Sequence, residues 1–300
     1  IDIMIVGEGI PFAKKLAVKL GKKKVIPFKK FGTALIPNND LQIEVATARK
    51  EAYEDDSRKP SKVIYTDLKG DLLRRDFTIN AMAMDIHPSR FGDLTDPFGG
   101  IADIENKILR TPLDPDETFS EDPLRMMRAA YFASKLGFQI EQRCRNSIKD
   151  QAYRIEIVSM ERIRDEFIKI LKTKKPSIGL VILQKTGLMK IVFPEIHVMY
   201  GMDQTSEWHH KDIFAHTLQV VDNSAQLSDK MEIRFSALVH DIAKPNTRRV
   251  DKNKGYTFHG HDAVGERMIE TVAKRMNLSN ELKDYLKKLP LLHLRPIALV

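Results

Sequence analysis

The hydrophobic pattern of the chain changes close to Asp122, and this change limits the folds that the chain can adopt. Before Asp122, short apolar or alternating runs of strand length surround one clear helical pattern. After it, apolar residues recur every three or four positions through long segments, which is the helical period. The sequence therefore predicts an α+β part with a small sheet, followed by an all-α part.

The expected elements of the α+β part are short. Strands are predicted over residues 1–6, 25–28, 32–36 and 41–46, and a helix over residues 11–20. In the last of these strands Ile43 and Val45 share one face, and Glu44 lies on the other. The polar stretch 53–69 predicts a loop, and residues 75–86 predict a helix followed by a strand.

The all-α part contains eight amphipathic segments. They predict helices over residues 123–136, 141–152, 160–172, 176–186, 214–226, 233–240, 263–276 and 280–289. Turn and helix-capping residues crowd the segment 111–123, "TPLDPDETFSEDP", and a second break is expected near residues 194–206. We therefore expect three domains, over residues 1–115, 116–200 and 201–300.

Composition narrows the class of protein. The 300 residues are 42% hydrophobic and 30% charged, which is typical of a water-soluble protein. No apolar run approaches the roughly 18 residues of a membrane span. The single cysteine, Cys144, excludes an internal disulfide and favours a reducing compartment. We therefore expect a cytoplasmic protein that does not bind membranes.

The charge of the chain favours a polyanionic partner. The net charge is +8, and no Asp or Glu occurs between Ile10 and Asn39. The lysines of this basic block are Lys14, Lys15, Lys19, Lys22, Lys23, Lys24, Lys29 and Lys30. The block could attract phosphates, and it could equally be a solvated helix face and loop.

Asp2 stands in the apolar run from Ile1 to Val6, which ends in Gly7-Glu8-Gly9. The run predicts a buried strand. Burial of a carboxylate costs free energy unless the group has a partner, a metal or a catalytic role. Asp2 is therefore a candidate functional residue.

Two motifs combine arginines with carboxylates. The first is "LLRRDFTINAMAMD", residues 72–85, and the second is "SEDPLRMMRAAYFASKLGF", residues 120–138. Arginine suits bidentate phosphate binding, although the first motif alone could also be a helix start capped by Asp76 or Thr78. In the second motif Asp122 and Arg125 lie three apart, so they could form a salt bridge or contact the edge of a base.

Within these two stretches, the motifs "RRDFTINAMA" (residues 74–83) and "EDPLRMMRAAYFASKLGF" (residues 121–138) resemble a known family, as do "LTDPFGGIADIENKILRT" (residues 94–111) and "ERIRDEF" (residues 161–167). It comprises the class II tRNA nucleotidyltransferases that add CCA ends, and the related bacterial poly(A) polymerases. The resemblance extends from Ile1 to about Leu188. It implies a polymerase-β-like nucleotidyltransferase head in the first domain, followed by a helical neck and body.

The resemblance gives the first domain a catalytic role. It implies that Asp2 is the second aspartate of a metal-binding D-x-D pair, whose first aspartate and Gly-rich turn would precede Ile1. Glu44 matches the third carboxylate of the family, although it could be merely a solvent-facing strand residue. The implied cofactor is Mg²⁺, which prefers oxygen ligands.

The resemblance also implies a nucleotide site. Arg75 and Arg128 would hold the triphosphate of the nucleotide. Asp76 and Asn80 would face its ribose. Asp122 and Arg125 would read the base edge and select CTP or ATP without a nucleic-acid template.

The implied reaction is in-line attack of an RNA 3′-hydroxyl on the α-phosphorus of a nucleoside triphosphate. The expected partners are the tRNA 3′ end, CTP and ATP. Poly(A) synthesis and addition of only CC or only A are alternatives within the same class. An RNA-binding module without catalysis is an alternative from another class.

The last hundred residues contain a second pattern. His216 lies on an amphipathic segment, and about two dozen residues later an apolar helix ends in His240-Asp241. Imidazoles and carboxylates form transition-metal sites, and this spacing resembles the HD phosphohydrolases. The resemblance implies a metal site of His216, His240 and Asp241, with a further Asp near or beyond Val300. The alternatives are a phosphohydrolase that acts on RNA ends and a helical body that keeps the fold without the chemistry.

Overall fold

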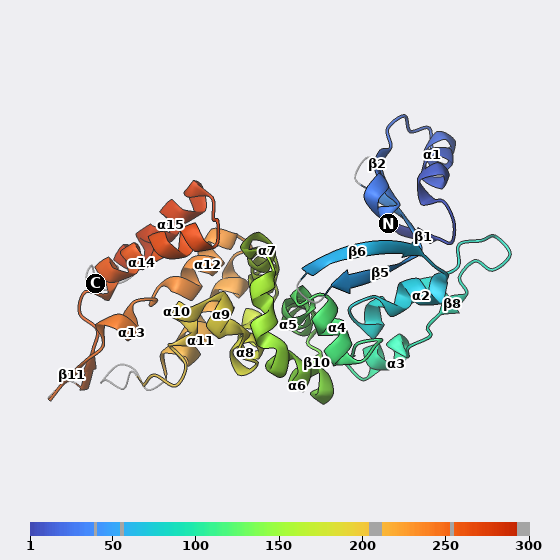
Figure 1. Cartoon of the computed structure of the whole chain (residues 1–300). Helices are drawn as coiled ribbons and strands as arrows, with labels where there is room; N and C mark the ends of the chain where they lie inside the picture. Colours follow the sequence, from blue (N-terminus) through green and yellow to red (C-terminus); the bar gives the residue numbers. More distant parts are fainter. Residues whose placement is uncertain (39–40, 55–56, 204–211, 253–254, 293–300) are drawn as a thin grey trace. The chain divides into compact units, whose positions relative to one another are not determined.

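The structure is a computed structural model of the chain that describes residues 1–38, 41–54, 57–203, 212–252 and 255–292 (Figure 1). It forms two compact units. The first contains residues 1–106 and 110–121, and the second contains residues 107–109 and 122–300. The expected change from a mixed α+β part to a helical part is confirmed, and it falls next to Asp122.

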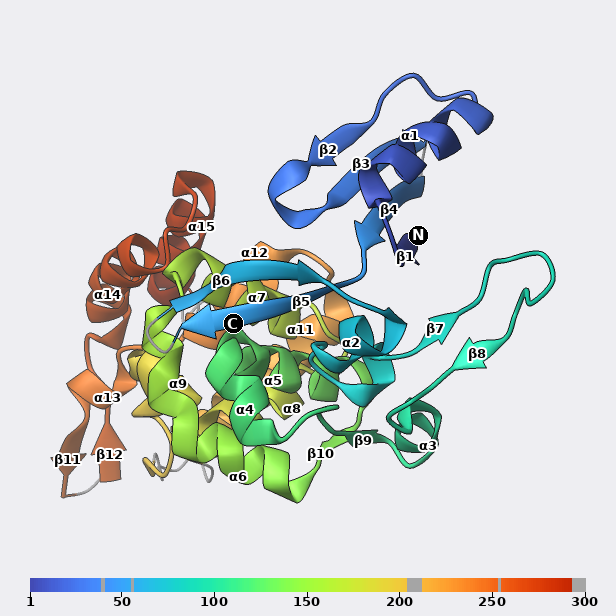
Figure 2. The same cartoon turned by 45° about the vertical axis from the view of Figure 1, so that its right-hand side comes forward.

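The first unit begins with a four-stranded sheet in the order β1-β4-β3-β2. The strands are β1 (Asp2–Ile5), β2 (Ile26–Phe28), β3 (Thr33–Asn38) and β4 (Leu41–Thr47). β1 runs parallel to β4, and the other two pairs are antiparallel. Helix α1 (Gly9–Lys19) lies along the sheet (Figure 2). These elements confirm the strands and the helix predicted for residues 1–46.

One face of this sheet forms the core of the head. Ala13 and Ala17 of α1 pack against buried residues of two strands. Those strand residues are Ala34, Ile36, Ile43 and Val45, with Ile3 and Ile5 of β1 partly buried beside them. The small alanines let the helix backbone approach the sheet closely. This one-sided core leaves the opposite face of β1 and β4 free to carry polar side chains.

A buried hydroxyl, that of Thr47, explains why the turn Gly7-Glu8-Gly9 after β1 needs glycine at Gly9. The Thr47 Oγ1 atom accepts a hydrogen bond from the Gly9 amide at 2.9 Å and donates one to the Gly32 carbonyl at 3.0 Å. A Cβ atom at Gly9 would lie 2.8 Å from that hydroxyl oxygen. The start of α1 is therefore fastened to the end of β4, and only glycine fits there without a shift.

The loop predicted for residues 53–69 is wrong. The segment contains the antiparallel strands β5 (Arg49–Glu54) and β6 (Ser57–Tyr65), and α2 (Leu68–Leu73) follows. Charged residues lower strand propensity only weakly, and pairing of two adjacent segments satisfies the backbone hydrogen bonds. The composition of the segment was therefore a poor guide to its structure.

The helix predicted within residues 75–86 is also wrong. The structure has a 3₁₀ turn, η2 (Thr78–Asn80), followed by a short strand, β7 (Ala83–Met84), that pairs with β8 (Leu94–Thr95). The Asp76 Oδ1 atom accepts hydrogen bonds from the Phe77 amide at 2.9 Å and the Asn80 Nδ2 at 3.1 Å. Such local side-chain bonds compete with a helix. Neither Asp76 nor Thr78 is an N-cap, because Phe77 occupies that position.

The loop before α3 (Gly100–Glu105) folds around one carboxylate. The two Asp96 oxygens accept hydrogen bonds from the amides of Gly100 at 2.7 Å and Ile101 at 2.9 Å. The helix packs on η2, where a Cβ atom at Gly100 would lie 2.5 Å from the Thr78 carbonyl oxygen. The Asp103 carboxylate accepts a 2.6 Å bond from the Thr78 hydroxyl. The motifs at residues 74–83 and 94–111 therefore pack on each other.

The second unit is helical. Its longer helices are α5 (Leu124–Leu136), α6 (Gln142–Gln151), α7 (Met160–Leu171), α8 (Pro176–Lys185), α11 (Ile213–Leu227), α12 (Met231–Val239), α14 (His261–Arg275) and α15 (Asn280–Leu292). They confirm the eight predicted helices with end points shifted by a few residues. Figure 1 shows α14 and α15 side by side.

Short elements join these helices and complete the first unit. They are α4 (Pro115–Glu121), η3 (Ala152–Ile157), α9 (Leu188–Val192), α10 (Pro194–His197), α13 (Lys244–Thr247), the parallel pair β9 (Ile108–Leu109) and β10 (Gln139–Ile140), and the hairpin of β11 (Arg249–Asp251) and β12 (Gly255–Thr257). No helix in the described ranges is long and apolar enough to cross a membrane.

A buried aromatic cluster and a buried arginine hold the second unit together. The rings of Phe167, Phe193 and Phe235 lie 5.7–6.3 Å apart between centroids. The guanidinium of Arg234 donates to the carbonyls of Leu171, Thr173, Ala225 and Ser228 at 2.7–3.1 Å and pairs with Asp229. One side chain thereby satisfies the carbonyl groups at two helix ends.

The Asp96 loop makes acid stability depend on one carboxyl group. Burial raises the pKa of Asp96, but the amides of Ile101, Gly100, Phe98 and Gly99 outweigh it and lower that pKa. The stabilisation is therefore present above the unfolded pKa of about 4 and is lost as the pH falls through the lower folded value.

We expect Asp96→Asn to lower the melting temperature at pH 7, and this difference from the unmodified chain should shrink between pH 5 and pH 3. The measurement is thermal unfolding followed by circular dichroism across that range. The control is Asp93→Asn at an exposed position nearby, for which we expect little change. A difference that stays constant down to pH 3 would contradict the role of the Asp96 carboxylate.

Candidate active site

Asp2 and Glu44 lie side by side in the first unit. Their Cα atoms are partners in the parallel ladder between β1 and β4. Both side chains are exposed, and the flanking Ile3, Ile43 and Val45 face the core on the other side. The prediction that Asp2 starts a buried strand is wrong, since its carboxylate points away from the core. Its presence in an apolar run therefore needs no buried partner.

This pair offers a suitable set of ligand atoms for a hard cation. Adjacent strands lie about 4.8 Å apart, so two carboxylates at the same register can reach one ion. Mg²⁺ prefers oxygen ligands and keeps several water molecules, which an exposed site allows. The residues present therefore fit the predicted cofactor.

The predicted triphosphate and ribose residues of the first unit form one cluster. The Arg75 guanidinium lies 3.5 Å from the Asn80 carbonyl oxygen, and the Asn80 side chain donates to Asp76. Asp76 is buried, whereas the Arg75 side chain is 38% exposed. Arg75 can therefore reach a ligand directly, and Asp76 orients Asn80.

Asp71, which was not among the predicted site residues, organises this cluster. Its buried carboxylate pairs with Arg74 at 2.8 Å and with Arg75 at 3.3 Å, and it accepts a bond from the Arg49 amide at 3.2 Å. Asp71 therefore holds both arginines of the "RRD" motif and joins them to the start of β5. The spacing of three and four residues to the arginines was the only available hint.

The remaining predicted nucleotide residues lie in the second unit. The Asp122 carboxylate accepts a bond from the Leu124 amide at 3.2 Å and lies 4.0 Å from Arg162. Arg125 follows in the first turn of α5 and is buried. Asp122 thus fixes the start of the helix that carries Arg125.

Arg128 is held by a carboxylate from α7. Its guanidinium lies 5.2 Å from the centre of the Phe132 ring and 3.8 Å from the Glu166 Oε1 atom. Glu166 is buried and pairs with Lys169 at 2.7 Å. Glu166 and Arg162 both belong to the "ERIRDEF" motif, whose role the sequence left unassigned. Through these two contacts the motif supports Asp122, just before α5, and Arg128 within α5.

A second cluster lies between α11, α12 and α14. His216, His240 and Asp241 each offer one ligand atom, and these atoms lie within 4.8 Å of one another. The Nε2 atoms of His216 and His240 are 3.2 Å apart, and His240 Nε2 is 3.0 Å from Asp241 Oδ2. The structure thus brings together the three predicted ligands. Residues 293–300, which include the region expected to hold a further Asp, lie outside the described residues.

Two residues that the sequence did not assign complete this cluster. The Lys244 ammonium lies 2.8 Å from Asp241 Oδ2, and His261 Nε2 lies 3.7 Å from Asp241 Oδ1. The Nδ1 atoms of His240 and His261 each lie 2.8 Å from a backbone carbonyl oxygen. An Nδ1–H that donates to a carbonyl leaves Nε2 with a lone pair for a metal.

The charge of Asp241 is strongly stabilised. Burial raises the pKa of this carboxyl, but His240 and the Lys244 ammonium outweigh burial and hold the pKa well below its usual range. Asp241 is therefore an ionised carboxylate in a buried site. Ionised oxygen and imidazole nitrogen together suit a divalent transition metal, so the residues fit such an ion.

Three domain families match the chain in succession. Residues 1–110 match the poly(A) polymerase head domain, and residues 137–200 match the "probable RNA and SrmB-binding site of polymerase A". Residues 213–298 match the HD domain. The order of these families along the chain confirms the expected resemblance.

Curated relatives carry a consistent name. The multifunctional CCA protein of Shewanella frigidimarina (strain NCIMB 400) is 37% identical over 290 residues, which cover 94% of this chain and 66% of the relative. That of Vibrio campbellii (strain ATCC BAA-1116) is 38% identical over 223 residues, which cover 72% of this chain and 52% of the relative. The chain thus spans less than two thirds of the length of these relatives.

A solved structure supports the fold. A tRNA-processing enzyme with CTP aligns with a TM-score of 0.66 and 25% identity, over 99% of this chain and 72% of that one. The alignment covers both the mixed head and the helical part. The expected fold class is therefore confirmed.

The role of Asp71 can be tested by stability. We expect Asp71→Ala to lower the free energy of unfolding by about 1–3 kcal/mol, because it leaves two arginines and a backbone amide without their carboxylate. Asp71→Asn should cost less, since an amide oxygen can still accept from the Arg49 amide. Urea unfolding followed by circular dichroism measures both. Equal stability of Asp71→Ala and the unmodified chain would contradict this assignment.

Proposed function

The chain belongs to the family of nucleotidyltransferases that carry a poly(A) polymerase head domain, and we propose that it adds or repairs the CCA 3′ end of tRNA. The donors are CTP and ATP, and the reaction needs no nucleic-acid template. The names of the relatives and the CTP bound to a similar tRNA-processing enzyme support this choice of substrates. The single thiol fits a cytoplasmic location.

The observation that carries the proposal is the in-register pair of Asp2 and Glu44 on the open face of the sheet. We assign both as catalytic ligands of Mg²⁺ in a two-metal site. Divalent cations bound there would activate the RNA 3′-hydroxyl and stabilise the pyrophosphate that leaves. The bond from O3′ to the α-phosphorus forms, the bond from that phosphorus to the pyrophosphate oxygen breaks, and the hydroxyl proton is released.

The other residues position the nucleotide. Arg75 and Arg128 neutralise the triphosphate, and their own carboxylates, Asp71 and Glu166, set their orientation. Asn80, oriented by Asp76, contacts the ribose hydroxyls. Such fixed partners matter because phosphoryl transfer depends on positioning and charge neutralisation more than on covalent chemistry by the protein.

Base choice is assigned to α5. Asp122 offers an acceptor and Arg125 offers a fork of donors, which together can match the edges of cytosine and adenine. Asp122 lies two residues before α5 and Arg125 lies in its first turn, and Arg125 is buried, so its rotamer freedom is small. Hydrogen bonds from the protein therefore replace those of a template.

The HD cluster supports a second candidate activity. We propose that His216, His240 and Asp241 hold a divalent transition metal in a phosphohydrolase that acts on RNA ends. Lys244 lies next to Asp241 and can neutralise a phosphate that approaches the site. A domain that keeps this fold without metal chemistry is the alternative outcome.

The transferase proposal is tested with tRNA transcripts that end before CCA, after C and after CC. The full-length protein is incubated with labelled CTP or ATP and Mg²⁺, and products are resolved by length. We expect addition that stops after CCA, and we expect Glu44→Gln to lower incorporation at least about 100-fold, because it removes one charged cation ligand. Gln42→Glu, on the same exposed face of β4, serves as the control.

A long A tail in this assay would instead support poly(A) polymerase. Addition of only CC or only A would support the corresponding variant. Incorporation by Glu44→Gln at the rate of the unmodified chain would remove Glu44 from the catalytic set.

The HD proposal is tested by metal content. After incubation with Ni²⁺, Co²⁺ or Mn²⁺ and removal of excess ion, we expect about one ion per chain, and its loss in His240→Ala. His259→Ala, which changes an exposed histidine near the cluster, should retain the ion. Hydrolysis of bis-p-nitrophenyl phosphate is the activity readout. Absence of both bound metal and hydrolysis would leave the cluster with a structural role.

A further inference from the structure

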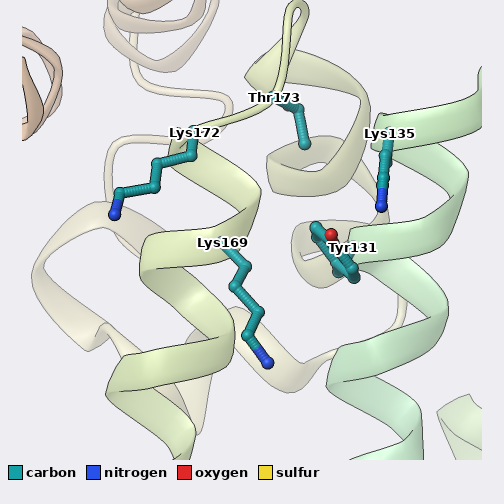
Figure 3. Close-up of a pocket in the computed structure, with 5 residues that line it drawn as sticks. All are labelled: Tyr131, Lys135, Lys169, Lys172 and Thr173. Carbon is teal, nitrogen blue, oxygen red and sulfur yellow. The ribbon is translucent and has the colours of Figure 1, made fainter. Parts of the chain in front are cut away.

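A cavity of about 190 Å³ lies between α5 and α7 in the second unit. Its lining residues are Tyr131, Lys135, Lys169, Lys172 and Thr173 (Figure 3). Tyr131 and Lys135 come from α5, and the others come from the last turn of α7 and the residues that follow it. None of these residues belongs to the predicted nucleotide site or to the HD cluster.

The charge around this cavity, here called the Tyr131 pocket, is strongly positive. Within the described part of the chain, Lys135 and Lys172 have no carboxylate within ion-pair distance. Lys169 pairs with Glu166, but that carboxylate also faces Arg128. One buried carboxylate is therefore shared by two cations, while two further lysines remain unneutralised. A concave site with this excess of positive charge attracts anions.

The pocket also offers an aromatic surface. The Tyr131 side chain is half-buried, and the Lys135 Nζ atom lies 5.5 Å from the centre of its ring. Figure 3 shows Lys135 extending toward Tyr131 on the same helix and Lys169 extending from α7 into the gap between the two helices, whereas Lys172 points away from that gap. A ring flanked by ammonium groups is the arrangement with which proteins bind single-stranded nucleic acid, since the base stacks and the phosphate is neutralised.

The position of the pocket along α5 fits an RNA strand. Tyr131 and Lys135 follow Arg125 by six and ten residues, which corresponds to about 9 and 15 Å along a helix. Lys169, Lys172 and Thr173 fall in the segment that matches an RNA-binding family. A few nucleotides of single strand can span this separation from the base-reading residues.

We propose that the Tyr131 pocket binds one nucleotide of the RNA substrate upstream of its growing 3′ end. The base stacks on Tyr131, and the phosphate lies between Lys135 and Lys169. This inference rests on the proposed transferase function. It assigns a strand-holding site within the second unit, separate from the residues expected to bind the incoming triphosphate.

The test measures RNA binding without catalysis. A labelled tRNA transcript that ends in CC is titrated with the chain by fluorescence anisotropy at several KCl concentrations, in the absence of nucleotides. We expect Lys135→Gln and Lys169→Gln each to reduce the slope of log affinity against log salt by about 0.7–0.9, the value for one lost phosphate contact. Tyr131→Leu should weaken binding at least about fivefold and leave the slope unchanged.

The control is Lys149→Gln, which removes the same charge from an exposed position on α6 and should change neither quantity. Circular dichroism of each variant verifies folding. CTP binding, measured by equilibrium dialysis, separates the two sources of phosphate, and it should be unchanged in Lys135→Gln and Tyr131→Leu. Loss of CTP binding with unchanged RNA binding would overturn the proposal, because the pocket would then hold the triphosphate.

RNA binding by the pocket variants and nucleotide incorporation together distinguish an error in the pocket assignment from an error in the transferase proposal. If the chain extends the transcript but all three pocket variants bind RNA as tightly as Lys149→Gln, only the pocket assignment is wrong. If the variants weaken RNA binding but no nucleotide is incorporated, the pocket stands as an RNA site and the transferase proposal fails. Absence of RNA binding by the unmodified chain would overturn both.

Discussion

The parallel register between β1 and β4 is the constraint on which the candidate catalytic site depends. With Asp2 opposite Glu44, Ile3 and Val45 enter the core together, and both carboxylates face solvent. A slip of one residue would turn Glu44 into the core and leave Val45 exposed. Burial of the apolar side chains therefore holds the two carboxylates at one position. The core of the head and the placement of its charges are two results of the same register.

Other carboxylates of the first unit have no assigned catalytic role and instead hold neighbouring groups of the chain in place. Asp71 holds the arginines of one motif, and Asp96 gathers the amides that begin α3. Asp103 joins the motifs through the Thr78 hydroxyl. Each group has its oxygens occupied by donors of the chain, whereas Asp2 and Glu44 are exposed. The motifs of the head thus contain both residues that can meet a ligand and residues that fix the backbone beneath them.

Sequence periodicity predicted the elements whose apolar pattern is regular, including β4 and the eight long helices. It placed Glu44 opposite the apolar face, and the spacing of His216 from His240-Asp241 indicated the second cluster. It failed for the β5–β6 hairpin, because pairing overrides the weak preferences of charged residues. It also missed contacts between distant segments, such as those of Glu166 with Arg128 and of His261 with Asp241, since no local pattern encodes them.

Glu166 connects two parts of the second unit that are assigned different roles. Its buried carboxylate lies 2.7 Å from Lys169 of the Tyr131 pocket and 3.8 Å from Arg128. A phosphate that approaches Lys169 competes with Glu166 for the ammonium, and the carboxylate then interacts more strongly with Arg128. Because the interior has a low effective dielectric constant, such a change alters the electrostatic energy of both cations. RNA held in the pocket and the arginine assigned to the triphosphate therefore share one counter-charge, so their electrostatics cannot be independent.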